Sequence, residues 1–356
     1  MKVGILTYHR AHNYGAVLQC FALQELLKQY GCDIEIIDYR QPFIEKLYSF
    51  NKLDWIKKNL LHPRNLLAYR KLLKQQQQSS SIFNNFRDSF LNSSNKVIDT
   101  QIPTYDLYIV GSDQMWSINC VGNAIDNVYF GNFHRPKSSK LIGFSVSSNA
   151  SSINHIGDSL INYINNFDNI SFRECEITRL VNQKFKKEFI TTLDPTLCLD
   201  ENRWDNIIDQ SWNKKKPYIV VYHVKLRFAK IAHDLMMKQA HILASRNNWD
   251  IIDLSSGNYS VTDFVSAIKY SQGVVTSSFH ATVFAVIFSR PILSVKLHDG
   301  NDGRYVDLLK SLNMTSSLVD LDFDPYFPND CNFKNVHEKL YELKQPSINY
   351  LVDYLK

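Results

Sequence analysis

Hydrophobic residues in the first part of this chain alternate between short runs and segments of helical spacing. The apolar run 3–7 is followed by residues 13–30, where apolar positions recur every three or four residues up to Gly31, and then by a second run at 34–39. This succession indicates strand, helix and strand, and a first strand that is apolar almost throughout is typical of a parallel sheet covered on both faces. The pattern therefore predicts an α/β fold.

The alternation is interrupted once and then resumes in two series. Residues 42–100 have a helical pattern and contain the polar run 75–81, which we interpret as a loop or a frayed helix end. The charged segment 214–217 separates the two later series. Further strands are expected at 107–110, 141–146, near Ile170, and at 218–222, 250–254, 273–276 and 292–295, with helices between them.

These patterns predict two doubly wound α/β domains in series. The first covers 1–200, with a helical excursion at about 42–100, and the second covers 214–334. A terminal helix at 335–356, interrupted near Pro346, ends the chain. Ligands of open α/β sheets bind at the carboxyl ends of the strands, so we expect a ligand cleft between the two domains.

Length and composition agree with two folded domains. The chain has 356 residues, of which 44% are hydrophobic and 13% aromatic, enough for two cores. No apolar run approaches the roughly 18 residues that span a bilayer, and the N-terminal run is too short for a signal peptide, so we expect a cytoplasmic protein. The six cysteines include no CxxC pair, which favours mostly buried, reduced thiols and no metal site.

The net charge of +5 is modest, but basic residues gather in one segment. Between positions 46 and 74 eight Lys and Arg residues, interleaved with leucines and aromatics, face a single acidic residue, Asp54. A basic amphipathic segment can bind an anionic membrane surface, which would place the protein peripherally at the inner face of a membrane. It can also pack on the catalytic domain with its lysines in solvent, the alternative that we favour. No motif for nucleic-acid binding accompanies the charge.

Polar side chains follow the first expected strand. His9, Arg10, Asn13 and Gly15 lie between this strand and the next helix. Free amides at the start of that helix would add to a site for an anion, so Arg10, Asn13 and Gly15 are candidate substrate-binding residues and His9 a candidate catalytic residue. The alternative is a capped helix entry, in which Asn13 caps the helix and Gly15 permits close packing.

Two further strand ends carry candidate groups. Ser112 and Asp113 bring a hydroxyl and a carboxylate to the end of one buried strand, where Asp113 is either catalytic or the cap of the following turn. Arg173 follows the strand near Ile170 and could hold a carboxylate or phosphate through two parallel hydrogen bonds. The alternative for Arg173 is an ion pair with Glu174 or another acidic residue at the helix start.

A fourth cluster follows the strand expected at 273–276. Ser277, Ser278 and His280 lie where this strand ends and an apolar helix begins. Amides at a helix start favour a bound anion, and an imidazole can exchange a proton there near neutral pH. A structural hydrogen-bonding role for His280 is the alternative.

Taken together, the strand-end clusters resemble the polysaccharide pyruvyl transferase family. The resemblance covers positions 1 to about 312, most of the chain. It implies two Rossmann-like doubly wound domains that face each other across a cleft, similar to the glycosyltransferase-B architecture. It also implies phosphoenolpyruvate as donor, a hexose of a polysaccharide or lipid-linked oligosaccharide as acceptor, a cyclic pyruvate ketal as product, and no cofactor. The segments that carry it are 4–19, 105–116, 171–174, 193–197 and 276–280.

The resemblance assigns roles to two residues. Arg173 matches the arginine of the family's Ser-x-Arg-acidic motif, and His280 matches the histidine of its second-domain motif. Many members have Arg where this chain has Ser278, and Gly where it has Ala281. We therefore expect a donor-binding cation from elsewhere, with Arg304 as the candidate. The general acid or base would be His280 or His9.

Two other functions fit the same patterns. A glycosyltransferase that uses a nucleotide sugar would have the same architecture, and donor choice separates it from a pyruvyl transferase. A non-catalytic glycan-binding protein of a polysaccharide assembly complex would bind glycans without turnover of any donor.

Overall fold

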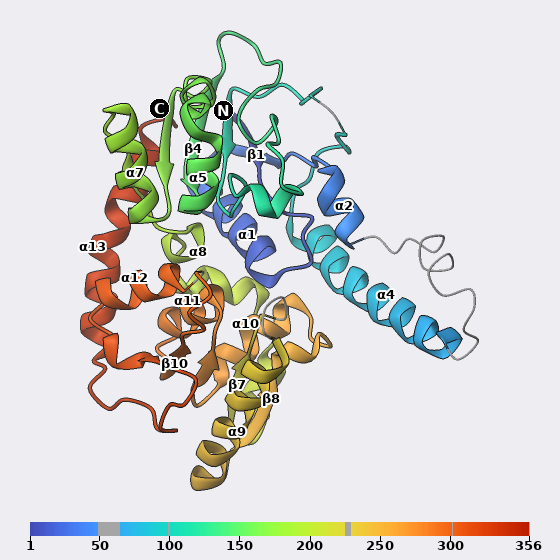
Figure 1. Ribbon diagram of the computed structural model, residues 1–356, viewed down its shortest axis with the longest axis vertical. Coiled ribbons are helices and arrows are strands. Elements are labelled where there is room, and N and C mark those ends of the chain that lie inside the picture. Colours follow the sequence, from blue (N-terminus) through green and yellow to red (C-terminus); the bar gives the residue numbers. More distant parts are fainter. Residues whose placement is uncertain (49–64, 99, 225–228, 301, 356) are drawn as a thin grey trace. The chain divides into compact units, whose positions relative to one another are not determined.

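The computed structural model describes residues 1–48, 65–98, 100–224, 229–300 and 302–355, with the backbone alone at 65–72 and 229 (Figure 1). The chain divides into two compact units. Unit 1 comprises Met1–Leu199 together with Gln345–Lys356, and unit 2 comprises Asp200–Lys344. The chain therefore returns to unit 1 for its last residues.

Unit 1 is built on a six-stranded sheet of order β2-β1-β3-β4-β5-β6, in which every neighbouring pair is parallel. The strands are β1 (Lys2–Leu6), β2 (Asp33–Ile36), β3 (Leu107–Val110), β4 (Lys140–Val146), β5 (Asn169–Phe172) and β6 (Ile190–Thr191). The helices are α1 (Tyr14–Lys28), α2 (Pro42–Tyr48), α4 (Asn65–Phe90), α5 (Ala150–Ile156), α6 (Leu160–Ile164), α7 (Cys175–Phe185) and α8 (Pro195–Cys198), and the last turns of α13 join this unit.

Unit 2 has a five-stranded parallel sheet of order β11-β10-β9-β7-β8. The strands are β7 (Tyr218–Tyr222), β8 (Asp250–Asp253), β9 (Val274–Thr276), β10 (Ile292–Val295) and β11 (Leu318–Val319). The helices are α9 (Ala229–Asn247), α10 (Val261–Tyr270), α11 (Phe279–Ile287), α12 (Gly303–Ser311) and α13 (Phe333–Val352). Short 3₁₀ helices are η1 (Ile118–Val121), η2 (Gly157–Ser159), η3 (Glu201–Ile207), η4 (Gln210–Lys214), η5 (Leu254–Ser256) and η6 (Thr315–Ser317).

The two sheets share one topology. In each, the first strand lies between the second and the third, so the chain reverses its direction of winding beside β1 in unit 1 and beside β7 in unit 2. The loops that leave the first and third strands diverge at such a switch point and leave a crevice outside the carboxyl ends. Topology therefore marks the ends of β1 and β3, and of β7 and β9, as the places for ligand-binding side chains.

Apolar burial explains the central elements. All four residues of β3 are buried, and thirteen of the fifteen residues of α1 are buried, because α1 packs against the sheet and against α8. The core of unit 1 is rich in aromatic rings, with Trp116 stacked on Phe130 at a centroid distance of 4.6 Å. In unit 2 Trp204 meets Phe284 edge-on at 4.7 Å. Offset and edge-on ring pairs add to the free energy gained by burial.

Gly111 lets β3 and β4 come close at the site. Its φ is +140°, and a Cβ at this position would lie 1.9 Å from the carbonyl oxygen of Phe144. Any other residue would push the two strand ends apart. The following residue, Ser112, is therefore held directly against the end of β4.

Two parallel α/β sheets confirm the predicted fold class. Three finer expectations were wrong. The polar run 75–81 lies inside α4, and α13 continues through Pro346 instead of breaking there. Both helices take support from neighbouring elements, which overrides the local signal. Of the cysteines, all free thiols, only Cys20 and Cys198 are buried, because the others lie at helix ends and in loops.

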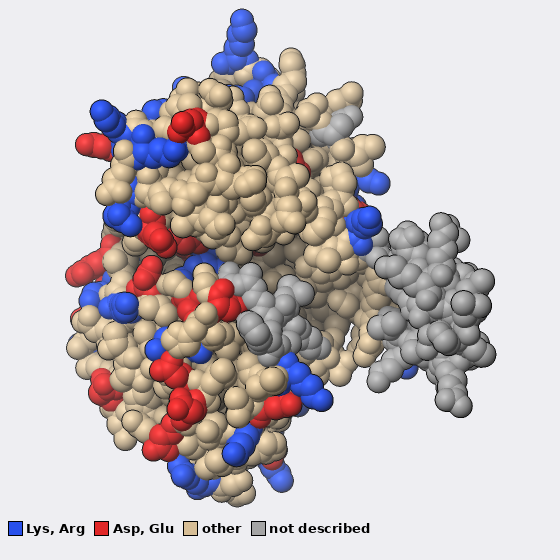
Figure 2. Space-filling model, viewed as in Figure 1, with Lys and Arg blue, Asp and Glu red and all other residues tan. Residues whose placement is uncertain are grey.

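The structure constrains the surface charge and the predicted membrane contact less than the fold. On the face drawn in Figure 2, acidic and basic side chains of the described residues are interspersed. Among the helices that the structure describes, none is both long and apolar enough to cross a membrane. Most of the basic segment 46–74 lies outside the residues whose side chains are described, so a membrane role for it stays a prediction, as does a cleft between the units.

Candidate functional site

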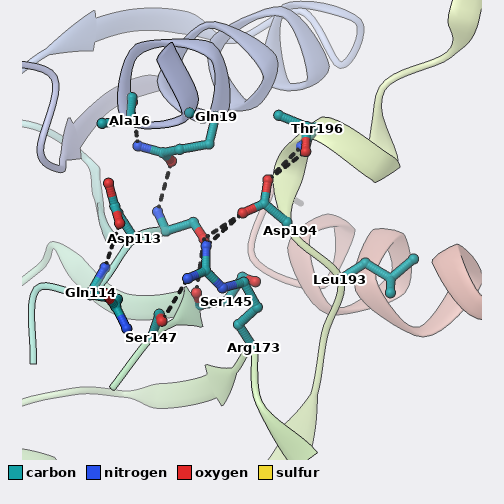
Figure 3. A network of polar contacts seen from close by, with 12 residues as sticks. Ala16, Gln19, Asp113, Gln114, Ser145, Ser147, Arg173, Leu193, Asp194 and Thr196 are labelled. Atoms are coloured by element: carbon teal, nitrogen blue, oxygen red, sulfur yellow. Dashed lines mark hydrogen bonds and ion pairs between the residues drawn. The ribbon is translucent and has the colours of Figure 1, made fainter. Parts of the chain in front are cut away.

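Arg173 lies at the centre of a buried polar network in unit 1 (Figure 3). It follows β5, and its side chain is 3% exposed. Its Nη1 donates to Oδ2 of Asp194 at 2.7 Å and its Nη2 donates to Oγ of Ser147 at 2.7 Å. Its Nε donates to Oε1 of Glu174 at 3.3 Å. The guanidinium thus ties the ends of β4 and β5 to the turn that begins α8.

The network continues to β3 and β1. The hydroxyl of Ser112 donates to the carbonyl oxygen of Ser145 at 3.0 Å, and its backbone N–H donates to Oε1 of Gln19 at 3.1 Å. Gln19 in turn donates through Nε2 to the hydroxyl of Thr7 at 2.8 Å. Residues from the ends of four neighbouring strands are therefore joined by one chain of hydrogen bonds.

Electrostatics favour the charged form of Arg173. Burial alone would lower its pKa, but the carboxylates of Glu174 and Asp194 outweigh burial and hold the pKa above its ordinary value. Asp194 is itself fixed, because its Oδ1 accepts the backbone N–H and the hydroxyl of Thr196 at 3.0 and 2.7 Å. A buried ion pair with this many hydrogen bonds is costly to break.

Two residues at this edge have left-handed backbone conformations. Asp113 has φ +68° and Ser145 has φ +51°. Such conformations are uncommon for non-glycine residues and cluster at functional sites. Asp113 is partly exposed at the end of β3, and its Oδ1 accepts the N–H of Gln114 at 2.7 Å. Among the unit 1 candidates, Asp113 is thus a carboxylate that solvent can reach.

A second charged group lies at the ends of β1 and β2. Oδ1 of Asp38 is 2.9 Å from Nε2 of His9 and accepts Nε of Arg10 at 2.5 Å. Its Oδ2 accepts Nη2 of Arg10 and of Arg40, at 2.5 and 2.8 Å. Burial alone would raise the pKa of Asp38, but the hydrogen bonds from His9, Arg10 and Arg40 hold it well below its usual range.

His9 is sealed inside this group. Its side chain is fully buried, and its Nδ1 lies 3.2 Å from the carbonyl oxygen of Thr7 while Nε2 faces Asp38. Burial is the largest effect on His9 and lowers its pKa, which keeps the imidazole neutral. Since both ring nitrogens have protein partners, the geometry makes His9 a support for Asp38.

Asn13 caps α1, as the alternative interpretation of this segment predicts. Its side chain accepts the N–H of Gly15 at 2.8 Å and of Ala16 at 3.3 Å. Gly15 is buried in the first turn of the helix. A cap satisfies amides that would otherwise lack a partner at the helix start.

The switch point of unit 2 carries imidazoles and hydroxyls. His223 follows β7, is 1% exposed, and has Nδ1 2.7 Å from Oγ of Ser277, which follows β9. The hydroxyl of Thr276 donates to the carbonyl oxygen of Tyr222 at 2.7 Å. Ser278 is the N-cap of α11, with its Oγ 3.5 Å from the N–H of Ala281.

His280 lies in the first turn of α11 and is 8% exposed, with its ring edge-on to Phe279 at 5.0 Å. The guanidinium carbon of Arg304 lies 5.8 Å from the centre of the Phe279 ring. Phe279 therefore stands beside both side chains within unit 2, so the structure brings Arg304 into the neighbourhood of His280.

The family model for polysaccharide pyruvyl transferase matches residues 13–299. This span contains Asn13, the Ser112–Asp113 turn, Arg173 and His280. The chain belongs to this family. It is accordingly a transferase that acts in polysaccharide biosynthesis on a glycan acceptor. No curated protein matches the sequence.

Three solved structures are similar to this pyruvyl transferase at low identity. A putative UDP-N-acetylglucosamine 2-epimerase from Listeria monocytogenes has a TM-score of 0.51 and 11% identity, over 100% of this chain and 95% of that chain. The S. aureus MnaA–UDP co-structure has a TM-score of 0.49 and 12% identity, over 100% and 96%. E. coli heptosyltransferase WaaC with ADP has a TM-score of 0.41 and 12% identity, over 96% and 99%. The epimerase supports the α/β fold and nothing further.

Sequence reasoning missed several groups of the transferase site. Asp38 and Arg40 follow β2 within four residues, and Asp194 lies in the segment 193–197, one of those that carry the family resemblance. His223 follows β7 just before residues 225–228, which the structure does not describe. A search of every strand end for polar residues would have found all four. Within the described ranges, no group of His, Cys, Asp and Glu could hold a metal ion.

Proposed function

We propose that this enzyme transfers the pyruvyl group of phosphoenolpyruvate to two hydroxyls of a hexose in a cell-surface polysaccharide or its lipid-linked precursor. The observation that carries the proposal is the family match over residues 13–299, which contains polar strand ends in both units. The product is a cyclic ketal. Phosphoenolpyruvate is a donor substrate, so the reaction requires no separate cofactor.

The reaction proceeds through protonation of the enol. A proton added to C3 of phosphoenolpyruvate leaves positive character at C2, which one sugar hydroxyl attacks with loss of its own proton. The C2–O bond to phosphate then breaks and inorganic phosphate departs. A second hydroxyl closes the ring on C2 and loses its proton. One acid and one base near neutral pKa, together with cationic or amide donors for the anions, serve all of these steps.

Unit 1 supplies charge in this proposal. Arg173 provides a permanent positive charge under the strand ends and fixes Ser112 and Ser147, so that the donor's carboxylate or phosphate meets a preorganised edge. Asp113 is the carboxylate that can accept a hydroxyl proton. Because three guanidinium nitrogens of Arg173 are engaged by protein oxygens, we assign Arg173 to positioning as well as to charge.

Unit 2 supplies the proton in this proposal. His280 is the proton donor to C3, since an imidazole is a common general acid and base in enzymes. Ser277 and Ser278 hold the substrate beside it, and His223 orients the Ser277 hydroxyl at 2.7 Å. Arg304 takes the place of the arginine that many members have where this chain has Ser278.

Release of phosphate from phosphoenolpyruvate tests the proposal. The full chain is incubated with the donor and a panel of glycan and lipid-linked acceptors, and phosphate is measured together with the acceptor's mass. We expect acceptor-dependent phosphate release and an acid-labile product that carries one pyruvyl group. Hydrolysis of a nucleotide sugar without any use of phosphoenolpyruvate would instead identify a glycosyltransferase. Glycan binding without turnover of either donor would identify a non-catalytic glycan-binding protein.

A further inference from the structure

Three arginines gather at the ends of β1 and β2 in unit 1. Arg10 and Arg40 both bond to the one carboxylate of Asp38, and their side chains remain 17% and 23% exposed. Arg87, from the last turn of α4, lies behind them and donates Nη1 to the carbonyl oxygen of His9 at 3.2 Å. We call Arg10, Arg40 and Arg87, with Asp38, the arginine cluster.

Positive charge exceeds negative charge in the arginine cluster. Asp38 is the buried carboxylate, whereas Glu45, 3.5 Å from Arg40, and Asp88, which acts on Arg87 from α4, are in contact with solvent. Nε of Arg87 is buried and has no hydrogen-bond partner among the described residues. Burial, followed by the charges of Arg10 and Arg40, lowers the pKa of Arg87 to about 10. The three arginines and Asp38 therefore have an excess of about two positive charges, which a bound dianion would neutralise.

The arginine cluster differs from the Arg173 network in its exposure to solvent. Arg173 is 3% exposed and bonds to Asp194, Ser147 and Glu174. Arg10 and Arg40 also bond to carboxylates, through Nε and Nη2 to Asp38 and, for Arg40, through Nη1 to Glu45 at 3.5 Å, but their side chains are 17% and 23% exposed. The two groups lie at different strand ends, because Arg173 follows β5 and contacts Ser112 after β3, whereas Arg10 follows β1 and Arg40 follows β2.

We propose that the arginine cluster binds the phosphoryl group of a phosphorylated sugar acceptor, with Arg10 and Arg40 as its direct ligands. This rests on the proposed function, which assigns the donor to the Arg173 network. The anion that the arginine cluster binds is then not the donor but belongs to the acceptor. Guanidinium groups form charge-assisted hydrogen bonds with phosphate, and three arginines with the one carboxylate of Asp38 have an excess charge of about +2, which matches a dianionic phosphoryl group better than a carboxylate. Arg87 acts behind them as a positioning residue.

Pyrophosphate binding tests the site without turnover. Isothermal titration of the full chain with pyrophosphate, and separately with a hexose 1-phosphate, is repeated on Arg40→Gln and Arg10→Gln. Loss of a hydrogen bond to a charged group should weaken binding about ten- to a hundred-fold. Arg40→Lys keeps the positive charge but lacks the planar guanidinium donors, so we expect a smaller loss of affinity. Arg179→Gln, which removes an exposed arginine of α7, is the matched control and should leave affinity unchanged.

Phosphoenolpyruvate separates the acceptor site from the donor site. Saturating pyrophosphate should not displace phosphoenolpyruvate, and Arg40→Gln should leave its affinity within about two-fold. Failure of the wild-type chain to bind pyrophosphate at millimolar concentration would overturn the proposal. The proposal would also be overturned if pyrophosphate displaced phosphoenolpyruvate and Arg40→Gln weakened the binding of both ligands equally. The same holds if a folded Arg10→Gln protein bound pyrophosphate with wild-type affinity. A chain that binds pyrophosphate but releases no phosphate from phosphoenolpyruvate would disprove the proposed function and leave this site standing.

Discussion

The two units place different chemistry at the same topological position. Both sheets reverse their winding beside the first strand, yet unit 1 fills this point with charges and unit 2 with imidazoles and hydroxyls. In unit 1 Arg173 and Asp194 are buried together, and Asp38 is fixed by two arginines. In unit 2 the close contact is between the imidazole of His223 and the hydroxyl of Ser277.

This difference shows how two domains of the same topology can take different roles in a transferase, one in anion binding and the other in proton transfer. Charges that never titrate near neutral pH hold anions and fix loops, but they cannot deliver a proton. Imidazoles deliver protons but hold anions weakly when neutral. The comparison therefore predicts that changes in unit 2 affect turnover, whereas changes in unit 1 affect stability and ligand affinity.

His280→Gln should produce the largest effect. Gln can hydrogen-bond but cannot exchange a proton near neutral pH, so turnover should fall about 10²–10⁴-fold while donor affinity and the unfolding midpoint stay near those of the wild type. Steady-state rates and titration with phosphoenolpyruvate measure this. His241→Gln, at an exposed position of α9, is the control. A folded and nearly fully active His280→Gln enzyme would move the proton-transfer role to His223.

Asp194→Asn should be the most destabilising of these changes in unit 1. The variant leaves Arg173 buried with less compensating charge, and the free energy of unfolding should fall by about 3 kcal/mol. Urea denaturation measures the change. Asp158→Asn removes an exposed partner of Lys184 in the same unit and should leave the midpoint unchanged. Equal midpoints for the two variants would show that the Arg173–Asp194 pair contributes no more than a surface pair.

Arg173→Ala should weaken phosphoenolpyruvate binding about ten- to a hundred-fold, because a charge-assisted hydrogen bond or its supporting field is lost. Arg173→Lys keeps the positive charge without the planar guanidinium donors. It should retain part of the donor affinity if charge is the main contribution to donor binding. Isothermal titration measures both, with Arg179→Ala as the control at an exposed arginine. Unchanged donor affinity in a folded Arg173→Ala protein would reduce Arg173 to a purely structural role.

Much of the fold was predictable because burial and periodicity agree over the central elements. The runs that became β1, β3 and β7 are apolar almost throughout, and α1 ends near Gly31 as its pattern indicated. The edge strands β6 and β11 have two residues each and carry no periodic signal. α12 was missed because its short amphipathic pattern follows an irregular loop.

The sequence predicted which residues lie at the candidate site, but not which side chains are their hydrogen-bond partners. Strand ends alone indicate His9, Ser112, Arg173 and His280. Which of them is buried and hydrogen-bonded within the protein depends on residues distant in sequence, such as Asp38 beside His9 and Asp194 beside Arg173. The return of the chain to unit 1 at Gln345 is a tertiary event too, supported by the hydroxyl of Ser347, which accepts the N–H of Leu193 at 2.8 Å.

The two helix caps give the smallest expected effect and the most direct comparison between units. Asn13 caps α1 through contacts of 2.8 and 3.3 Å, whereas Ser278 caps α11 through one contact of 3.5 Å. Asn13→Ala should therefore lower the free energy of unfolding by about 1 kcal/mol, and Ser278→Ala by less. Denaturation measures both, and donor titration adds a second readout. Because Asn13 is committed to α1, its replacement by Asp, another good cap, should preserve stability and donor affinity together. Loss of donor affinity in a fully stable Asn13→Asp protein would instead return Asn13 to the substrate-binding residues, and the cap would then be a second role of the same side chain.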